Sequence, residues 1–157
     1  MQGEKIDLDR FDCAILDVLS TDGRISITDL ARRIGLSKSP TQARLRRMER
    51  AGVITGYRAL LDPVQLGLDH VAFVEVKLAD TRERALQAFN KAVLQVAEIE
   101  QAHMIASHFD YLLKVRTSDM AAYRTILGEK ISALPHVAST STYVAMQAVK
   151  DTGLAEM

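Results

Sequence analysis

Apolar residues recur at helical spacing in the first part of the chain. Between residues 7 and 22 they fall at intervals of three, four and seven, on one face of a helix that should start at Asp7: Leu8, Phe11, Ile15, Val18 and Leu19. A second stripe follows at Ile27, Leu30, Ala31 and Ile34. Ser26 with Asp29 three residues later resembles a capping box, and Gly35 can take the left-handed conformation that ends a helix.

A third helix is predicted from Ser39 to Ala51. Ser39 can cap it, Pro40 can occupy its first position, where a missing N–H costs nothing, and Leu45 and Met48 would face inward. Only residues 35–38 separate it from the second helix. Such a short connection is typical of a helix-turn-helix, whose later helix enters the DNA major groove, although an ordinary pair of antiparallel helices also fits the pattern.

The pattern changes after Gly52. Residues 53–61 read as an extended strand, interrupted at Asp62 and Pro63, so we expect a hinge over residues 53–66. The predicted domains on either side are a helix-turn-helix domain over 1–52 and a second domain over 67–157.

The second domain alternates strands and helices. Strands are predicted over 70–78, 98–106, 110–117 and 137–149, and helices over 81–93 and 119–133, the latter with Met120, Tyr123, Leu127 and Ile131 inward. The order β-α-β-β-α-β is the split arrangement of ferredoxin-like domains, so the fold class is α+β. Two helices cover only one sheet face. The other, carrying Val71, Phe73 and either Tyr111 or Leu112, needs a cover, and a second copy of the chain is the simplest supplier.

Composition indicates a globular protein of the cytoplasm. The hydrophobic fraction is 48%, no apolar stretch approaches the roughly 20 residues of a membrane helix, and the N-terminus lacks the apolar core of a signal peptide. The single Cys13 cannot form an internal disulfide.

Charge is distributed unevenly. The net charge is zero, but residues 1–60 hold 11 Lys and Arg against 8 Asp and Glu, and residues 61–157 hold 9 against 12. Within residues 32–50, seven Lys and Arg face one glutamate, Glu49. Such a basic patch can release counterions from a phosphate backbone, although a solvated helix face can also be basic. The polar face of the third helix predicts contacts with double-stranded DNA through Lys38, Ser39, Thr41, Gln42, Arg44, Arg46, Arg47 and Arg50.

Five stretches, in order along the chain, resemble the leucine-responsive/asparagine-responsive (Lrp/AsnC) transcription regulators. They are LDRFDCAIL at 8–16, DGRISITDLARRIGLS at 22–37, RLRRMERAGVITGYRALLDP at 44–63, FDYLLKVRTSDMAAY at 109–123 and LPHVASTSTYVAMQAVK at 134–150. The resemblance implies a winged helix-turn-helix and an effector-sensing, oligomerising domain, in a nucleoid-associated bacterial or archaeal protein without a cofactor. It also implies dimers that assemble further, often to octamers, and an amino-acid effector.

The resemblance also implies effector-binding positions. They are Met104, Ser107, His108, Asp110, Met120, Tyr143, Val144 and Ala145. The family usually has Gly near Ser107 and His108, and often at His136; side chains at such turns can narrow a pocket. The amino-acid sequence of residues 57–78 and 101–149 resembles that of the activators of proline catabolism. Together with the resemblance to leucine-responsive regulators, this makes leucine or proline the expected effector.

Other chemistry finds little support in the sequence. The histidines lack metal-binding spacing, and no nucleophile motif or phosphate-binding loop is present. Asp110 could cap backbone N–H groups or bind a ligand amine. Two other classes stay open: an architectural protein that binds DNA broadly without an effector, and an amino-acid-binding enzyme or enzyme regulator whose helical part only contacts another protein.

Overall fold

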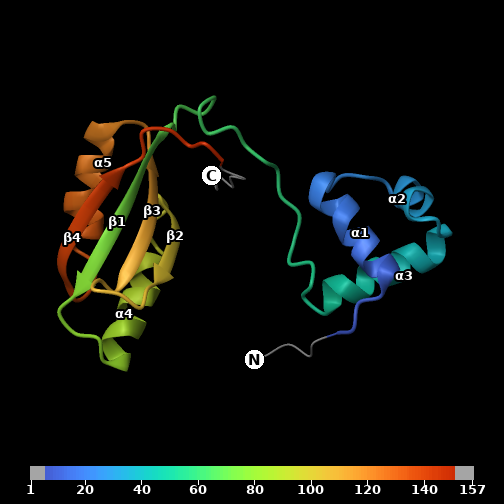
Figure 1. The fold of residues 1–157 in the computed structure, drawn as a ribbon, viewed down its shortest axis with the longest axis horizontal. Coiled ribbons are helices and arrows are strands. Elements are labelled where there is room, and N and C mark those ends of the chain that lie inside the picture. Colours follow the sequence, from blue (N-terminus) through green and yellow to red (C-terminus); the bar gives the residue numbers. More distant parts are fainter. Residues whose placement is uncertain (1–5, 151–157) are drawn as a thin grey trace. The chain divides into compact units, whose positions relative to one another are not determined.

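The computed structural model describes residues 6–150 and divides the chain into two compact units, one ending at Ala59 and the other beginning at Leu60. Figure 1 shows helices in the first unit and a sheet with helices in the second. Each unit has its own apolar core. Residues 1–5 and 151–157, which the predicted domain ranges include, lie outside the described residues.

The first unit contains α1 (Arg10–Thr21), α2 (Ile27–Ile34) and α3 (Lys38–Arg50). One fully buried side chain from each helix, Ile15, Leu30 and Met48, forms the core. Each therefore anchors its helix, and the apolar stripes that the sequence shows are the faces that meet.

Local side chains determine where these helices begin and end. Asp9 and Asp12 form a capping box, so α1 begins at Arg10 and the predicted start at Asp7 is wrong. Ser26 accepts the backbone N–H of Asp29 at 3.1 Å, and Gly35 ends α2 with φ of 71°, as predicted. The turn between α2 and α3 is thereby held tightly.

The third helix begins earlier than the sequence predicts. Its N-cap is Ser37, so Ser39 and Pro40 lie inside the first turn and the predicted cap at Ser39 is wrong. The first four N–H groups of a helix have no partner within it, so proline is tolerated at Pro40 as well as at the first position.

The predicted strand over residues 53–61 is absent, and the segment instead folds back on α3. The backbone N–H groups of Val53 and Ile54 donate to the carbonyl of Met48, and Ile54 packs against the core of the first unit. A strand needs a hydrogen-bonding partner, and the described residues of this unit supply none.

The second unit is a four-stranded antiparallel sheet in the order β2-β3-β1-β4. The strands are β1 (His70–Leu78), β2 (Ile99–Met104), β3 (Tyr111–Thr117) and β4 (Val137–Val144), and the helices are α4 (Glu83–Val93) and α5 (Met120–Ile126). A π-helical turn, η1 (Leu127–Ile131), extends α5. The ferredoxin-like prediction is confirmed, although β4 ends five residues before the predicted Val149.

The helices cover one face of the sheet. Facing them are the fully buried Val74, Val76 and Leu113, against Phe89 and Tyr123. Tyr111 pairs with Val76 and belongs to this covered face, whereas Leu112 pairs with Glu75 and lies on the open face. The prediction that Met120 faces inward is wrong, because this first residue of α5 is 55% exposed.

Candidate functional site

The exposed face of α3 is polar and cationic. Lys38, Ser39, Arg46 and Arg50 are exposed and Gln42 is half-buried. Arg50 donates from Nε to the carbonyl of Arg46 at 3.3 Å, which holds the two cations near each other on one face. Donors for phosphates and for base edges are thus available along this helix.

Thr41 does not belong to that face. It is fully buried, and its Oγ1 donates to the carbonyl of Ser37 at 2.9 Å. The prediction that Thr41 faces outward is wrong, because Thr41 lies four residues before Leu45 and seven before Met48 and therefore shares their inward face.

Arg44 and Arg47 pair with the fully buried carboxylate of Asp12 on α1. Arg44 NH1 lies 2.9 Å from Asp12 Oδ1, and Arg47 NH2 lies 2.5 Å from Asp12 Oδ2. Arg44 NH1 also lies 2.7 Å from Asp9 Oδ2. Both arginines are therefore engaged within the protein, which the sequence prediction of an outward cationic face did not anticipate.

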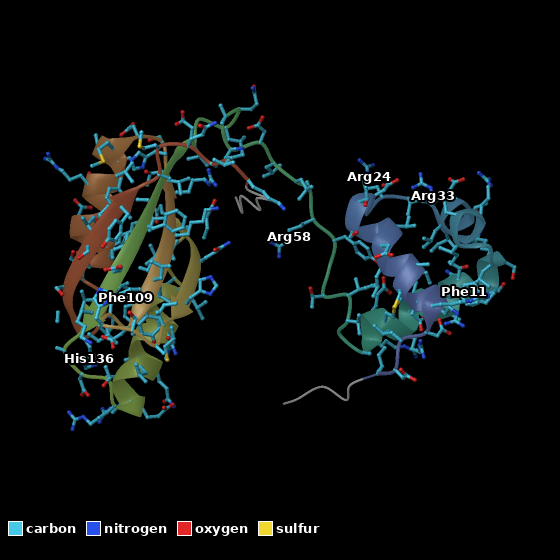
Figure 2. All side chains as sticks on the ribbon, in the orientation of Figure 1. Phe11, Arg24, Arg33, Arg58, Phe109 and His136 are labelled. Atoms are coloured by element: carbon cyan, nitrogen blue, oxygen red, sulfur yellow. The ribbon has the colours of Figure 1, made fainter. Side chains whose placement is uncertain are left out.

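The ion pairs between α1 and α3 also shift the pKa values of Asp9 and Arg44. The backbone N–H of Asp12, foremost, and then Arg44 lower the pKa of Asp9, and the hydrogen bonds from Arg44 to Asp12 and Asp9 raise the pKa of Arg44. The guanidinium of Arg44 lies 5.5 Å from the ring centre of Phe11, which is labelled in Figure 2. Aromatic and anionic partners together hold this arginine in place.

Tyr57 ties the segment after α3 to that helix. Its hydroxyl donates to Glu49 Oε1 at 2.9 Å, and burial, followed by this carboxylate, raises the pKa of Tyr57 to about 12. The segment is therefore held against the end of α3.

Half of the predicted effector residues lie at the β2–β3 turn. Met104 is 56% exposed at the end of β2. Ser107 Oγ lies 3.1 Å from His108 Nδ1, and His108 Nε2 lies 3.7 Å from Glu75 Oε2. This turn presents a mixed polar and apolar surface.

Asp110 has a structural role at that turn. Its Oδ2 accepts the backbone N–H of Leu78 at 2.8 Å, Lys77 Nζ donates to Oδ1 at 3.4 Å, and its own N–H donates to the carbonyl of Val76. Of the two roles that the sequence leaves open, the structure shows the capping of a backbone N–H group.

The other predicted effector residues lie at the opposite end of the sheet. Val144 pairs with Ala72 near the start of β1, and Met120 begins α5 just after β3, whereas the hairpin turn adjoins Val76 and Leu78 at the end of β1. Four to six strand residues separate the ends, which is roughly 15–20 Å. One chain therefore does not bring Met104, Ser107, His108 and Asp110 together with Met120, Tyr143, Val144 and Ala145.

The turn residues differ in backbone conformation. His136 has φ of 65°, in the left-handed region, which agrees with the expectation that glycine fits there. Neither Ser107 nor His108 is in this region. Figure 2 shows His136 and Phe109 at the same end of the sheet. Nearby, hydrogen bonds from Arg82 lower the pKa of Asp80 to about 2.

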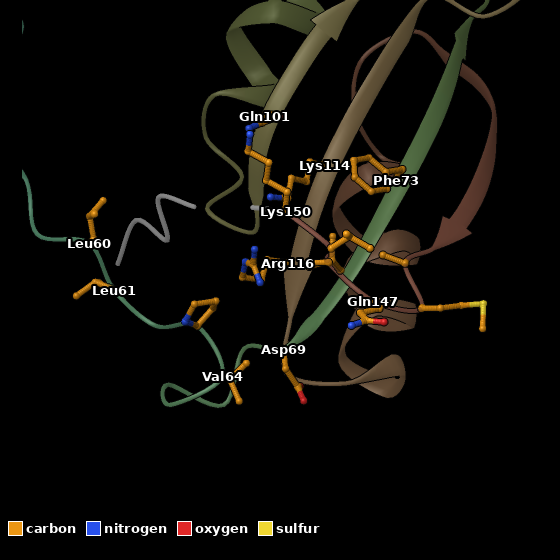
Figure 3. Close-up of a pocket in the computed structure, with 16 residues that line it drawn as sticks. Leu60, Leu61, Val64, Asp69, Phe73, Gln101, Lys114, Arg116, Gln147 and Lys150 are labelled. Carbon is orange, nitrogen blue, oxygen red and sulfur yellow. The ribbon is translucent and has the colours of Figure 1, made fainter. Parts of the chain in front are cut away.

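The open face of the sheet carries a groove of about 980 Å³ (Figure 3). Val71 and Phe73 supply apolar floor, and Lys114 and Arg116 supply cations. Lys114 Nζ lies 3.2 Å from Glu100 Oε2, and Arg116 pairs with the same carboxylate. The remaining lining includes Leu60, Leu61, Pro63 and Val64 on one segment and residues 145–150 on another.

The sequence analysis missed two carboxylates that pair with cations: Asp12 on α1, which pairs with arginines of α3, and Glu100 on β2, which pairs with cations of β3. Asp12 could have been found, because it falls four residues after Leu8 and three before Ile15, inside the apolar stripe of α1. Glu100 gave no comparable signal, since β2 is half-exposed and exposed throughout.

No helix within residues 6–150 is long and apolar enough to cross a membrane. No group of three or more His, Cys, Asp or Glu side chains there is placed to hold a metal ion.

Comparisons with known proteins agree with this division into two units. Residues 8–55 match the family profile "Winged helix-turn-helix DNA-binding", and residues 71–155 match "Lrp/AsnC ligand binding domain". The chain is 60% identical over 148 residues to the proline dehydrogenase transcriptional activator of Rhizobium radiobacter, covering 94% of this chain and 95% of that protein. It is 48% identical over 144 residues to the leucine-responsive regulatory protein of Escherichia coli K12, covering 92% and 88%.

Solved structures show the same fold. An AsnC family transcriptional regulator from Agrobacterium tumefaciens superposes with a TM-score of 0.87 at 33% identity, covering 94% of this chain and 96% of that one. A transcriptional regulator from Neisseria meningitidis, solved in complex with L-Met, has a TM-score of 0.86 at 29% identity, covering 92% and 94%.

The helix-turn-helix unit and the ferredoxin-like unit define a DNA-binding transcription regulator with a ligand-binding domain. The chain belongs to the Lrp/AsnC family.

Proposed function

We propose that the chain binds double-stranded DNA in a sequence-specific manner through the exposed face of α3. The observation that carries this proposal is the set of exposed or half-buried donors on one face: Lys38, Ser39, Gln42, Arg46 and Arg50. Arg46 and Arg50 would contact phosphate or guanine, and Gln42 could pair with adenine. Residues 1–52 would form the DNA-binding domain and residues 67–157 the sensor. Of the proposed hinge, residues 53–66, the part up to Ala59 belongs to the first unit, so the bending would occur after it.

The test is fluorescence anisotropy at one fixed salt concentration. A duplex selected by the protein from a random pool competes against unselected duplex. Selected DNA should compete at least 10³-fold better, the lower end of the range for specific regulators. Equal competition by both duplexes would support the architectural alternative. Arg46→Ala should weaken binding, whereas Arg84→Ala, on an exposed position of the other unit, should not.

We further propose that an amino acid, with proline or leucine the first candidates, binds between subunits. Two observations support this. Relatives include regulators named for proline dehydrogenase and for leucine, and one related structure contains L-Met. Within one chain the predicted effector residues lie at opposite ends of the sheet, so a pocket containing both groups requires a second subunit.

A thermal-shift screen of the twenty amino acids tests the sensor. A ligand that binds only the native state raises the melting temperature, by an amount that grows with ligand concentration. Tyr143→Ala should reduce the shift, whereas Leu94→Ala, exposed at the end of α4, should not. A screen in which no amino acid gives a shift would contradict the proposal.

In the cell, the protein would act in the cytoplasm at the nucleoid, as a dimer or a larger assembly such as an octamer. Self-association is supported by the apolar side chain of Phe73, which is 37% exposed on the open sheet face. The regulated genes would belong to amino-acid metabolism, with proline catabolism suggested by the 60% identical relative.

A further inference from the structure

A buried carboxylate lies between the first and third helices of the DNA-binding unit. Asp12 is fully buried on the inward face of α1 and accepts three donors. They are the backbone N–H of Asp9 at 3.0 Å, Arg44 NH1 at 2.9 Å and Arg47 NH2 at 2.5 Å. Each carboxylate oxygen holds one arginine, so α3 is attached to α1 at two points three residues apart.

These two arginines do not share a face with the proposed DNA contacts. With 3.6 residues per turn, the direction midway between Arg44 and Arg47 lies roughly 110° around α3 from that of Arg46 and Arg50. The side chain of Arg44 is 28% exposed, whereas that of Arg47 is 46% exposed and is held by its ion pair with Asp12. If either guanidinium turned to a phosphate, it would leave an oxygen of a buried carboxylate without its cation, which is unfavourable.

We propose that Asp12 is a positioning residue for the recognition helix. It holds Arg44 and Arg47 so that they set the orientation of α3 and do not neutralise phosphates. Lys38, Arg46 and Arg50 are then the cations of α3 that release counterions from DNA. This inference rests on the proposed DNA-binding face.

Matched Arg→Gln variants separate the two kinds of arginine. The probe is a random-sequence duplex, and binding is measured from 50 to 200 mM salt. Affinity falls as salt rises, and each lost phosphate contact makes the slope of log affinity against log salt shallower by about 0.9. Arg46→Gln and Arg50→Gln should each do so. Arg44→Gln and Arg47→Gln should leave the slope unchanged and lower the preference for a selected duplex over random DNA about tenfold.

Asp12→Asn tests the anchor itself. Two released guanidiniums should steepen the slope by up to about 1.8, from two new phosphate contacts, while the preference for selected DNA falls. All measurements are made below the melting temperature of each variant, determined by circular dichroism. If Asp12→Asn does not fold, Arg44→Gln and Arg47→Gln still test the inference. Each of these variants leaves one arginine paired with Asp12, so the buried carboxylate keeps a cation.

Two results would overturn the inference while leaving the proposed DNA-binding face intact. In one, Arg44→Gln and Arg47→Gln flatten the slope as much as Arg46→Gln, which makes them phosphate contacts. In the other, folded anchor variants lose thermal stability but keep the wild-type slope and preference, which indicates a structural role alone. If Arg46→Gln and Arg50→Gln leave the slope unchanged, the proposed DNA-binding face itself is wrong, and the role of Asp12 falls with it.

Discussion

His136 holds a backbone conformation that side chains oppose. Among the described residues it is the one non-glycine residue with positive φ, at 65°. Neighbouring backbone holds this conformation, because the carbonyl of His136 accepts the N–H of Ala79 at 2.8 Å and the next residue, Val137, begins β4. The left-handed region costs a residue with a Cβ roughly 1–2 kcal/mol.

His136→Gly should therefore stabilise the protein by about 1 kcal/mol, because relief of this strain exceeds the extra backbone freedom that glycine gives the unfolded chain. His136→Val should destabilise it by a similar amount, since a β-branched residue is opposed most strongly there. Urea unfolding followed by circular dichroism measures both. A lower stability for His136→Gly than for wild type would show that the imidazole makes a contact that outweighs the strain.

Asp9 gives the DNA-binding unit a dependence on pH. Its pKa is lowered in the fold, so its stabilising contribution is present above the unfolded value of about 3.9 and is lost as pH falls through the lower folded value. Asp9→Asn should be less stable than wild type at pH 6, and the difference should shrink below about pH 3. Asp17→Asn, at an exposed position of α1, serves as the control and should not lower stability at pH 6. A difference that persists unchanged into acid would contradict this.

At the scale of helices and strands, periodicity predicted the elements with a buried stripe. The strand over residues 70–78 was predicted with the bounds that the structure has, because its side chains alternate between two faces over that whole length. The strand predicted over residues 53–61 is absent. Its β-branched residues Val53 and Ile54 favour a strand, but they also fit a segment that folds back so that Ile54 packs on the core. The cap of α3 could not be decided from sequence, because Ser37 and Ser39 both suit the position.

The β2–β3 hairpin depends on one carboxylate. Asp110→Ala should destabilise the second unit by about 1–3 kcal/mol, because the partly buried N–H of Leu78 loses its acceptor. Asp110→Asn keeps an oxygen acceptor and should remain close to wild type in stability. Urea unfolding of the two variants is the measurement.

The same pair of variants tests the ligand. If Asp110 also binds the amine of an amino acid, Asp110→Asn should lose the thermal shift while keeping stability. A stable Asp110→Asn variant with a wild-type shift would leave Asp110 with its structural role alone.

At the scale of the whole molecule, the family resemblance predicts effector positions, but the sequence does not reveal that one chain separates them. The distances between these predicted positions depend on strand order and direction, which periodicity alone does not specify. The partners of Arg44 and Arg47 depend likewise on how α1 crosses α3. Both gaps concern contacts between residues distant in sequence.

Assembly should depend on the open sheet face. Phe73 is 37% exposed there, and a carboxylate at this position would be desolvated by any second copy packed on the sheet. Phe73→Glu should shift the protein towards monomer in analytical ultracentrifugation and weaken binding to selected DNA, since paired recognition helices are lost. Leu94→Glu, 80% exposed at the end of α4, is the control and should keep the wild-type mass. An unchanged mass for Phe73→Glu would place the contact between subunits on another surface.

Assembly and ligand binding should therefore fail together. Because the two groups of predicted effector residues lie at opposite ends of one sheet, a monomer holds only half of each shared pocket, and an amino acid should have too few contacts to bind. In the thermal-shift assay, the amino acid that raises the melting temperature of wild type most should give no shift with Phe73→Glu and the full shift with Leu94→Glu. By linkage, the same amino acid should change the concentration at which wild-type subunits associate. A monomeric variant that keeps the full shift would show that the pocket lies within one chain.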